Sequence, residues 1–274
     1  MLKKQPALKR SLTGMIKVVV CGALGRMGTT IGRMINEASD LELLGGVANK
    51  SGSFFGVDVV ESSELSRLLE QKKPDVLIDF TIADAAVQNV KAAAKAGTAL
   101  VIGTTGFTPA QRVAMAKAIE GTVPAVISSN YSIGVNVFWQ LLRTAAPLLA
   151  DYDIEVIEAH HRYKKDAPSG TATTILQIID EEIGERRKQY GREGMKEREK
   201  KEIGVHTIRG GDIVGDHSVV FSGNFETITL AHRAYDRSVL AHGALLAARW
   251  VIFQKPGIYG MNDVLAAFPD QRKE

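Results

Sequence analysis

The chain has 274 residues, with 34 Lys and Arg against 31 Asp and Glu, and its formal net charge is +3. Charges that are so nearly balanced and scattered exclude the basic patch of a nucleic-acid-binding protein, and no apolar run is long enough to span a membrane. The single cysteine, Cys21, cannot form an internal disulfide, so we expect a cytoplasmic protein in a reducing compartment.

Residues 1–14 form a basic segment ahead of a second methionine, Met15, which opens the first predicted strand. The segment lacks the apolar core of a secretory signal peptide. We expect an unstructured leader here, with a targeting segment as the alternative.

A strand, a glycine-rich turn and a helix are predicted in that order after the leader. The β-branched run 15–21 predicts the strand, and residues 29–37 have the period of a helix. The turn 22–28 has glycine at its first, fourth and seventh positions, with Leu24 in place of the usual middle glycine. Because a second strand is predicted over 41–48, this context indicates a dinucleotide-binding turn.

The position that holds the adenosine ribose in such domains lies at the end of the second strand, where this chain has Asn49 and Lys50. Asn49 removes the carboxylate that would repel a 2′-phosphate, and Lys50 supplies a charge that attracts one. A solvated turn is the alternative, because Asn-Lys-Ser-Gly also suits a loop. The position favours the cofactor interpretation, so we expect both NADPH and NADH to work, with NADPH preferred.

Three further predicted strands end in small or polar residues. They cover 75–81, 100–102 and 124–127. A helix over 83–96 is predicted after the first, and the last two run into Gly103–Gly106 and Ser128–Tyr131. Open α/β sheets bind ligands at the carboxyl ends of their strands. Gly103–Gly106 alone is more typical of an ordinary turn, but the succession of such strand ends favours a binding site.

The most informative segment is 158–172, which contains two adjacent histidines, a lysine and a Ser-Gly-Thr turn. An alternating apolar run over 154–157 predicts a strand before it, and a helical pattern over 173–183 follows. Side chains alternate on a strand, so His160 and His161 face opposite ways. One is a candidate acid or base, and the other is a candidate substrate ligand or packing group.

The start of the following helix has the composition of an anion site. Ser169 is a suitable N-cap, and Gly170 lets a ligand approach the backbone closely. The first backbone N–H groups of a helix lack internal partners and can hold a carboxylate. An ordinary capped helix is the alternative, but the neighbouring histidines and lysine favour a site for a carboxylated substrate.

The rest of the chain suggests a second domain. Residues 185–202 are dense in charge and predict a solvated helix or loop. His206, His217 and His232 have no familiar metal-ligand spacing, so we expect structural histidines and no metal site. The remaining predicted elements are a helix over 136–149, antiparallel strands over 205–209, 213–221 and 226–232, and a helix over 241–253 that returns to the first sheet.

We therefore predict an α/β protein with a discontinuous Rossmann-like dinucleotide domain. This domain comprises residues 15–131 and 241–274. Residues 132–240 form an α+β substrate domain with a largely antiparallel sheet.

The chain resembles the 4-hydroxy-tetrahydrodipicolinate reductase family, also called dihydrodipicolinate reductase. The motifs that carry the resemblance are 22–28, 102–107, 130–136, 158–172 and 209–217, in family order. The resemblance implies the reduction of a cyclic imine dicarboxylate by NADPH or NADH in lysine and diaminopimelate biosynthesis. It also implies a homotetramer joined through the antiparallel sheets.

The resemblance assigns roles to individual residues. His160 is implied to be the catalytic acid/base, with Lys164 as its cationic partner. The substrate contacts implied are His161, Gly170 and Thr171, with Ser169 at the helix start. The implied cofactor residues are Gly22, Ala23, Leu24, Gly25, Arg26, Met27, Gly103, Thr104, Thr105, Ser128, Ser129, Asn130 and Tyr131. Many members carry Glu-Arg where this chain has Asn49-Lys50, which bears on the choice of cofactor.

Two other functions compete with this one. A nicotinamide dehydrogenase of the aspartate or homoserine type would share the first domain, but it gives no reason for the His-His-Lys-Ser-Gly-Thr block. A non-catalytic NAD(P)-sensing protein needs only the glycine-rich half. His160 and Lys164 argue against such a sensor.

Overall fold

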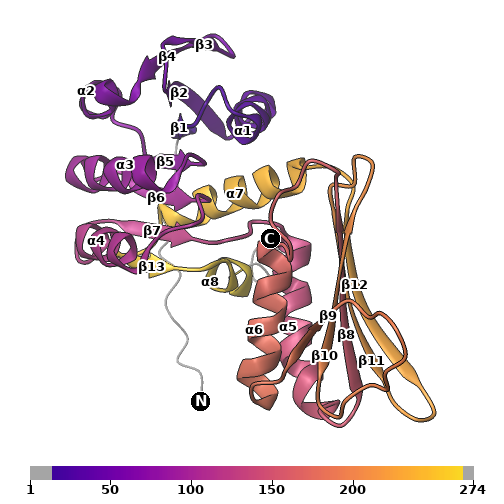
Figure 1. Ribbon diagram of the computed structural model, residues 1–274. Coiled ribbons are helices and arrows are strands. Elements are labelled where there is room, and N and C mark those ends of the chain that lie inside the picture. The colour runs from indigo at the N-terminus through magenta and orange to yellow at the C-terminus, as the bar shows by residue number, and fades with distance from the viewer. Residues whose placement is uncertain (1–13, 268–274) are drawn as a thin grey trace. The chain divides into compact units, whose positions relative to one another are not determined.

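The computed structural model describes residues 14–267, so all of the predicted leader except Gly14 lies outside the described residues. The chain divides into two compact units (Figure 1). One contains residues up to Tyr131 and from Leu240 onward, and the other contains Ser132–Val239.

The first unit is built on an eight-stranded sheet. Its strands are β1 (Ile16–Cys21), β2 (Leu41–Ala48), β3 (Gly52–Phe54), β4 (Val57–Glu61), β5 (Val76–Asp79), β6 (Ala99–Ile102), β7 (Pro124–Ile127) and β13 (Gly257–Tyr259). Their order is β13-β7-β6-β5-β1-β2-β4-β3, and only β3 and β4 pair antiparallel. Strands β5 and β6 are buried along their whole length, as parallel strands covered on both faces require.

The strand order fixes where this unit can bind a ligand. The chain leaves β1 toward β2 on one side and later returns to β5 on the other side. The turns after β1 and β5 therefore lie together at the switch point of the sheet, where open α/β folds bind their ligands. The helices are α1 (Arg26–Glu37), α2 (Leu65–Lys72), α3 (Ala83–Ala96), α4 (Pro109–Ile119), α7 (Ser238–Val251) and α8 (Met261–Ala266), with a short 3₁₀ turn at Ser62–Glu64.

Most of the predicted elements of this unit are confirmed. Strand β2 and helix α3 have the predicted bounds, whereas α1 begins at Arg26, three residues before the predicted helix. The sequence did not indicate β3, β4, α2, α4, β13 or α8. Most of these elements are short, and α4 has no distinct apolar face, so it gives no helical period.

The second unit is a five-stranded sheet covered by two helices. Its elements are α5 (Ile133–Leu148), β8 (Asp153–His160), α6 (Gly170–Ile183), β9 (Lys188–Tyr190), β10 (Ile203–Arg209), β11 (Gly215–Ser222) and β12 (Thr227–Ala234). The strand order is β12-β11-β8-β10-β9. Figure 1 shows α5 and α6 side by side along the sheet, and apolar side chains of β8, β10 and β11 join theirs in one core.

Two expectations for this unit need correction. Strand β10 pairs in parallel with β8 and β9, because the chain crosses over through α6 before it returns; β11 and β12 pair antiparallel as predicted. The charged segment 185–202 is not simply solvated. It contributes the edge strand β9, and Glu202 is buried against Arg187 and Arg192 at 2.8 and 2.6 Å.

No helix among residues 14–267 combines the length and the apolar character needed to cross a membrane.

Candidate active site

The turn after β1 requires glycine at two positions. Gly22 has φ +80°, and a Cβ there would press against the carbonyl oxygen of Phe80. A Cβ on Gly28 would collide with the carbonyl group of Gly22 and with Ala23. Strand and helix therefore approach as closely as a dinucleotide-binding turn requires.

Helix α1 begins beside this turn with its positive end open. Its N-cap residue, Gly25, offers no capping side chain, and the first turn contains no acidic residue. Arg26 is exposed at the same point and adds a positive charge. This helix end fits the pyrophosphate of a dinucleotide.

The end of β2 lies next to the glycine turn. The backbone N–H groups of Gly22 and Ala23 donate to the Val47 carbonyl at 2.9 and 3.1 Å. Asn49 and Lys50 follow directly and are exposed. The position expected for an adenosine ribose therefore lies beside the glycine turn.

A buried carboxylate ties the turns after β5 and β6 together. Asp79 is fully buried and accepts hydrogen bonds from the hydroxyls of Thr81 and Thr104, both at 2.7 Å. The backbone N–H of Thr81 and the side chain of Asn89 on α3 also donate to it, at 3.0 and 2.7 Å. A buried carboxyl group needs such partners, and here they fix the turns after β5 and β6 relative to each other.

The aromatic rings of Phe80 and Tyr131 pack against the turns at the ends of these strands. The Phe80 ring occupies the space that a side chain on Gly103 would need, and it lies 5.7 Å from the Tyr131 ring. The Tyr131 hydroxyl lies 3.0 and 2.9 Å from the carbonyls of Ile102 and Val126. Burial raises the pKa of Tyr131 well above its usual value, so the hydroxyl stays protonated.

The predicted cofactor residues of these turns thus separate into two groups. The side chains of Thr104 and Tyr131 are buried and hold the turns, whereas Thr105 and Ser129 are exposed on them. The Ser128 hydroxyl closes the last turn by donating to the Asn130 carbonyl at 2.8 Å.

In the second unit, the inward face of β8 changes from apolar to polar along the strand. Ile154 and Val156 pack in the core, and Glu158 and His160 continue the same face. Glu158 is 1% exposed and His160 is 9% exposed. The strand therefore carries two buried ionisable groups to its carboxyl end.

The Glu158 carboxylate is held by three groups from different elements. Nδ1 of His160 lies 2.5 Å from Oε2. Arg209 of β10 donates to both oxygens at 2.9 and 2.8 Å, and the backbone N–H of Ser169 donates at 3.0 Å. Burial alone would raise the pKa of Glu158, but the hydrogen bonds from His160 and Arg209 outweigh it and lower that pKa to about 2.

This contact determines which nitrogen of His160 carries a proton. An ionised carboxylate can only accept hydrogen bonds, so Nδ1 must be the donor toward Glu158. Among the described residues, Nε2 of His160 has no hydrogen-bond partner. This nitrogen is not among the fully buried polar atoms that lack a partner. Nε2 of His160 therefore keeps contact with solvent and can meet a substrate.

The predicted N-cap of the following helix is confirmed. The Ser169 hydroxyl accepts from the Ala172 N–H at 3.2 Å and also lies 3.2 Å from Nε2 of His217. Because this hydroxyl already has two partners, Ser169 can contribute to substrate binding mainly through its place in the turn. Gly170 is exposed, with no atom within 4 Å of where its Cβ would lie, and Thr171 is half-buried.

His217 is close to the predicted acid. Its ring lies 5.1 Å from that of His160, edge to face. Burial, helped by a charge on His160, lowers the pKa of His217 to about 3, so His217 stays neutral at physiological pH. The pair therefore carries at most one positive charge, on His160.

Lys164 lies in the loop between β8 and α6. Its Nζ is 2.9 Å from the Asp166 carboxylate, and Arg209 donates to the Asp166 carbonyl at 2.6 Å. Burial opposes ionisation of Asp166, but Lys164 lowers its pKa overall. Arg209 thus connects the Lys164 loop to Glu158. On the same loop, Nε2 of His161 lies 3.0 Å from an Arg237 nitrogen.

The sequence analysis missed Glu158 and Arg209 as parts of the site, and it treated His217 only as structural. A signal for Glu158 was present, because residues two apart on a strand share a face and an ionisable residue in an apolar strand needs a partner. No comparable signal existed for Arg209, which lies 51 residues from Glu158 in the chain.

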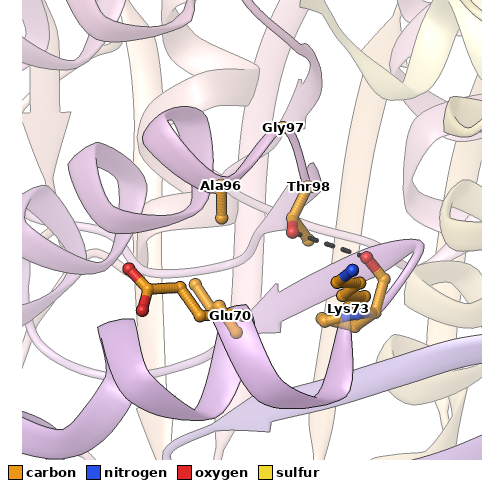
Figure 2. A pocket seen from close by; sticks show the side chains of 7 residues that line it. Glu70, Lys73, Ala96, Gly97 and Thr98 are labelled. Carbon is orange, nitrogen blue, oxygen red and sulfur yellow. Dashed lines mark hydrogen bonds between the residues drawn. The ribbon is translucent and has the colours of Figure 1, made fainter.

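A surface pocket lies elsewhere on the first unit. Figure 2 shows Glu70, Lys73, Ala96, Gly97 and Thr98 around it, at the carboxyl ends of α2 and α3. Pro74 and Thr98 precede β5 and β6, so the pocket lies at the amino ends of these strands, opposite the turns that follow them. It contains none of the predicted site residues.

Comparisons with known proteins identify the family of the chain. The family descriptions "Dihydrodipicolinate reductase, N-terminus" and "Dihydrodipicolinate reductase, C-terminus" match residues 16–131 and 134–265. The 4-hydroxy-tetrahydrodipicolinate reductases of Methanoregula boonei and Methanoculleus marisnigri are 72% and 65% identical over 251 residues, covering 92% of this chain and 98% and 99% of theirs. A solved dipicolinate-bound dihydrodipicolinate reductase from Paenisporosarcina sp. TG-14 matches with a TM-score of 0.76 at 26% identity, covering 90% of this chain and 99% of that chain.

The lowered pKa of Glu158 predicts a pH-dependent contribution to stability. The pKa of Glu158 is about 2 in the folded protein and 4.5 ordinarily, so ionisation of Glu158 stabilises the fold by roughly 3 kcal/mol at pH values above 4.5. This contribution is lost as the pH falls toward 2. Glu158→Gln should therefore lower the free energy of unfolding strongly at neutral pH and much less at about pH 3. Urea unfolding of both proteins at the two pH values measures this.

Glu197→Gln is the matched control, because Glu197 is exposed and should show almost no difference at either pH. If Glu158→Gln cost the same free energy at both pH values, the carboxylate would not be held as an ion.

Proposed function

The chain belongs to the dihydrodipicolinate reductase family, and on that premise we propose how its residues reduce 4-hydroxy-tetrahydrodipicolinate to tetrahydrodipicolinate. It is an NAD(P)H-dependent oxidoreductase of lysine and diaminopimelate biosynthesis. One observation carries the proposal: His160 is held through Nδ1 by a buried carboxylate that also holds the start of α6. The aspartate or homoserine dehydrogenase and sensor alternatives give no reason for that arrangement.

His160 serves as the proton donor. The net change adds a hydride and a proton to the ring and releases water, and the reduced nicotinamide supplies the hydride when it is bound. Electron density displaced in the ring must collect the proton at a neighbouring atom. Nε2 of His160 is placed to deliver it, because Glu158 occupies Nδ1 and stabilises the imidazolium.

Lys164 and the start of α6 hold the two carboxylates of the substrate. Lys164 exchanges Asp166 for a substrate carboxylate and offsets the negative charge that develops in the ring. The second carboxylate rests on the helix end at Ser169, Gly170 and Thr171, with His161 beside it. The bound dipicolinate of the Paenisporosarcina relative supports a clamp for a planar dicarboxylate.

The cofactor occupies the carboxyl edge of the first sheet. Its pyrophosphate rests on residues 22–27, and the turns 103–105 and 128–131 line the rest of the dinucleotide. The glycine turn and the open start of α1 support this placement. The adenosine ribose lies at Asn49 and Lys50, and this pair makes NADPH the preferred cofactor over NADH.

The protein works as a cytoplasmic homotetramer. Helices α5 and α6 cover one face of the second sheet, and the opposite face carries Ile157, Ile208 and Val220, of which Ile208 is exposed. Sedimentation equilibrium should give four times the 29.6 kDa chain mass; a monomer would contradict the tetramer.

The buried, free Cys21 supports a reducing compartment.

The activity itself is tested by following NADPH and NADH oxidation with the cyclic substrate formed in situ. His160→Gln should lower kcat by about two orders of magnitude, the usual scale for a lost general acid. NADPH affinity should stay within about twofold, because His160 lies outside the cofactor unit. A variant that retained the wild-type kcat would remove His160 from the mechanism.

Binding of carboxylate analogues tests the clamp. Dipicolinate should compete with substrate and raise the melting temperature, whereas picolinate, with one carboxylate, should bind at least about tenfold more weakly, since a charge-assisted pair is worth about 1.5–3 kcal/mol. Lys164→Ala should weaken dipicolinate and leave picolinate less affected. Equal affinity of the wild type for both analogues would mean that only one carboxylate is recognised.

Steady-state kinetics with both cofactors tests the ribose position. NADPH should have the higher kcat/KM by up to about tenfold, because NADH lacks a carboxylate partner and exposed Lys50 adds about 1 kcal/mol or less to NADPH binding. Raising salt should narrow the gap, since the phosphate–lysine attraction is screened. Asn49→Glu should move the preference toward NADH.

Lys50→Ala is the matched control, because it should lower kcat/KM for NADPH and leave that for NADH unchanged. A wild type that prefers NADH by tenfold or more would mean that another group holds the adenosine ribose.

A further inference from the structure

The position opposite His160 on the neighbouring strand has no side chain. Strands β8 and β11 pair antiparallel with His217 opposite Glu158, which puts Gly215 opposite His160 on the same face. Gly215 is buried and opens β11. A Cβ built on it would lie 3.2 Å from Nε2 of His160.

The space beside Gly215 lies next to Nε2 of His160. Glu158 occupies Nδ1 of His160, so Nε2 is the nitrogen left for a substrate. The imidazole extends over the β11 backbone at Gly215, where any other residue would place a carbon atom. The approach to Nε2 is therefore open because residue 215 is glycine.

The ring cannot easily move to accept a larger residue. A 3.2 Å contact is tighter than ordinary, so the neighbour must give way by a few tenths of an ångström. Movement of His160 would stretch its 2.5 Å contact with Glu158 or press the ring against His217, which packs 5.1 Å away. A side chain at 215 must therefore disturb either the orientation of His160 or access to Nε2.

The backbone does not itself require glycine here. Gly215 is outside the positive-φ region, so alanine can adopt its conformation. Gly210, at the end of β10, also has an ordinary φ, but a Cβ there would meet nothing within 4 Å. What distinguishes Gly215 is therefore the space it leaves beside His160.

We propose that Gly215 is a positioning residue for the reduction, and that its missing side chain keeps Nε2 of His160 oriented and accessible to the substrate atom that takes the proton. The proposal depends on the proposed role of His160. It predicts that the smallest possible enlargement at this position slows proton transfer without harming the fold.

The test compares Gly215→Ala, Gly210→Ala and His160→Gln in the full-length enzyme. Gly215→Ala should lower kcat about tenfold, since displacements below 1 Å at reacting groups cost this much. Its melting temperature should be unchanged or slightly higher, because Gly→Ala at a compatible φ restricts the unfolded chain. Its Kd for NADPH and its inhibition by dipicolinate should stay within about threefold, and Gly210→Ala should match the wild type.

Isotope effects separate a positioning role from a general structural one. The solvent isotope effect on kcat should rise in Gly215→Ala, because proton delivery becomes the slower step. The primary isotope effect on kcat, measured with NADPH deuterated at the transferred hydrogen, should not rise together with the solvent isotope effect. An increase in both, or in neither, would overturn the proposal.

The remaining outcomes distinguish this proposal from the proposed function. A normal kcat in Gly215→Ala together with a hundredfold loss in His160→Gln would overturn the role of Gly215 and leave His160 as the acid. A normal kcat in His160→Gln would instead overturn the proposed function. Gly215→Ala would also overturn the proposal if its lower kcat came with a lower melting temperature and a weaker affinity for NADPH. The substitution would then act through the fold.

Discussion

The buried carboxylate of Glu158 is the interaction on which the rest of the second unit depends. It joins β8 to β10 through Arg209 and to the start of α6 through the Ser169 N–H, and it holds His160 by Nδ1. An ion in the interior is tolerated only when its partners are complete, and removing one partner of a buried pair costs about 3–5 kcal/mol. The arrangement of His160 and the arrangement of α6 are therefore not independent, because both are set by one side chain.

The first unit contains a comparable buried carboxyl group. Asp79 ends β5 as Glu158 nearly ends β8, and it holds the turns after β5 and β6 through Thr81 and Thr104. In each unit, a polar residue on an otherwise buried strand fixes loops that would be mobile without it. Glycines at the same strand ends stand where a side chain would crowd its neighbours: Gly22 in the turn after β1 and Gly215 beside His160. A buried carboxyl group and a glycine near a strand end are thus common to both units.

Much of this architecture could be predicted from sequence, because its signals are local. The glycine spacing at 22–28, the buried runs of β5 and β6, and the Ser169 cap each follow from residues close together in the chain. The partners of Glu158 and Asp79 could not be predicted, since Arg209 and Thr104 are 51 and 25 residues away and only the sheet order brings them together. The parallel direction of β10 was missed for a similar reason. The residues of the strand do not reveal its direction, which is determined by the crossover through α6.

The tautomer of His160 is the most direct test of the central role of Glu158. ¹⁵N NMR of histidine-labelled protein reports which ring nitrogen is protonated, and His160→Gln identifies the signal by its loss. At a pH where the ring is neutral, the hydrogen bond to Glu158 predicts the proton on Nδ1, with Nε2 unprotonated, and Glu158→Gln should remove this preference. A wild-type His160 that carries its neutral proton on Nε2 would contradict the account, because Glu158 could not then be holding the ring.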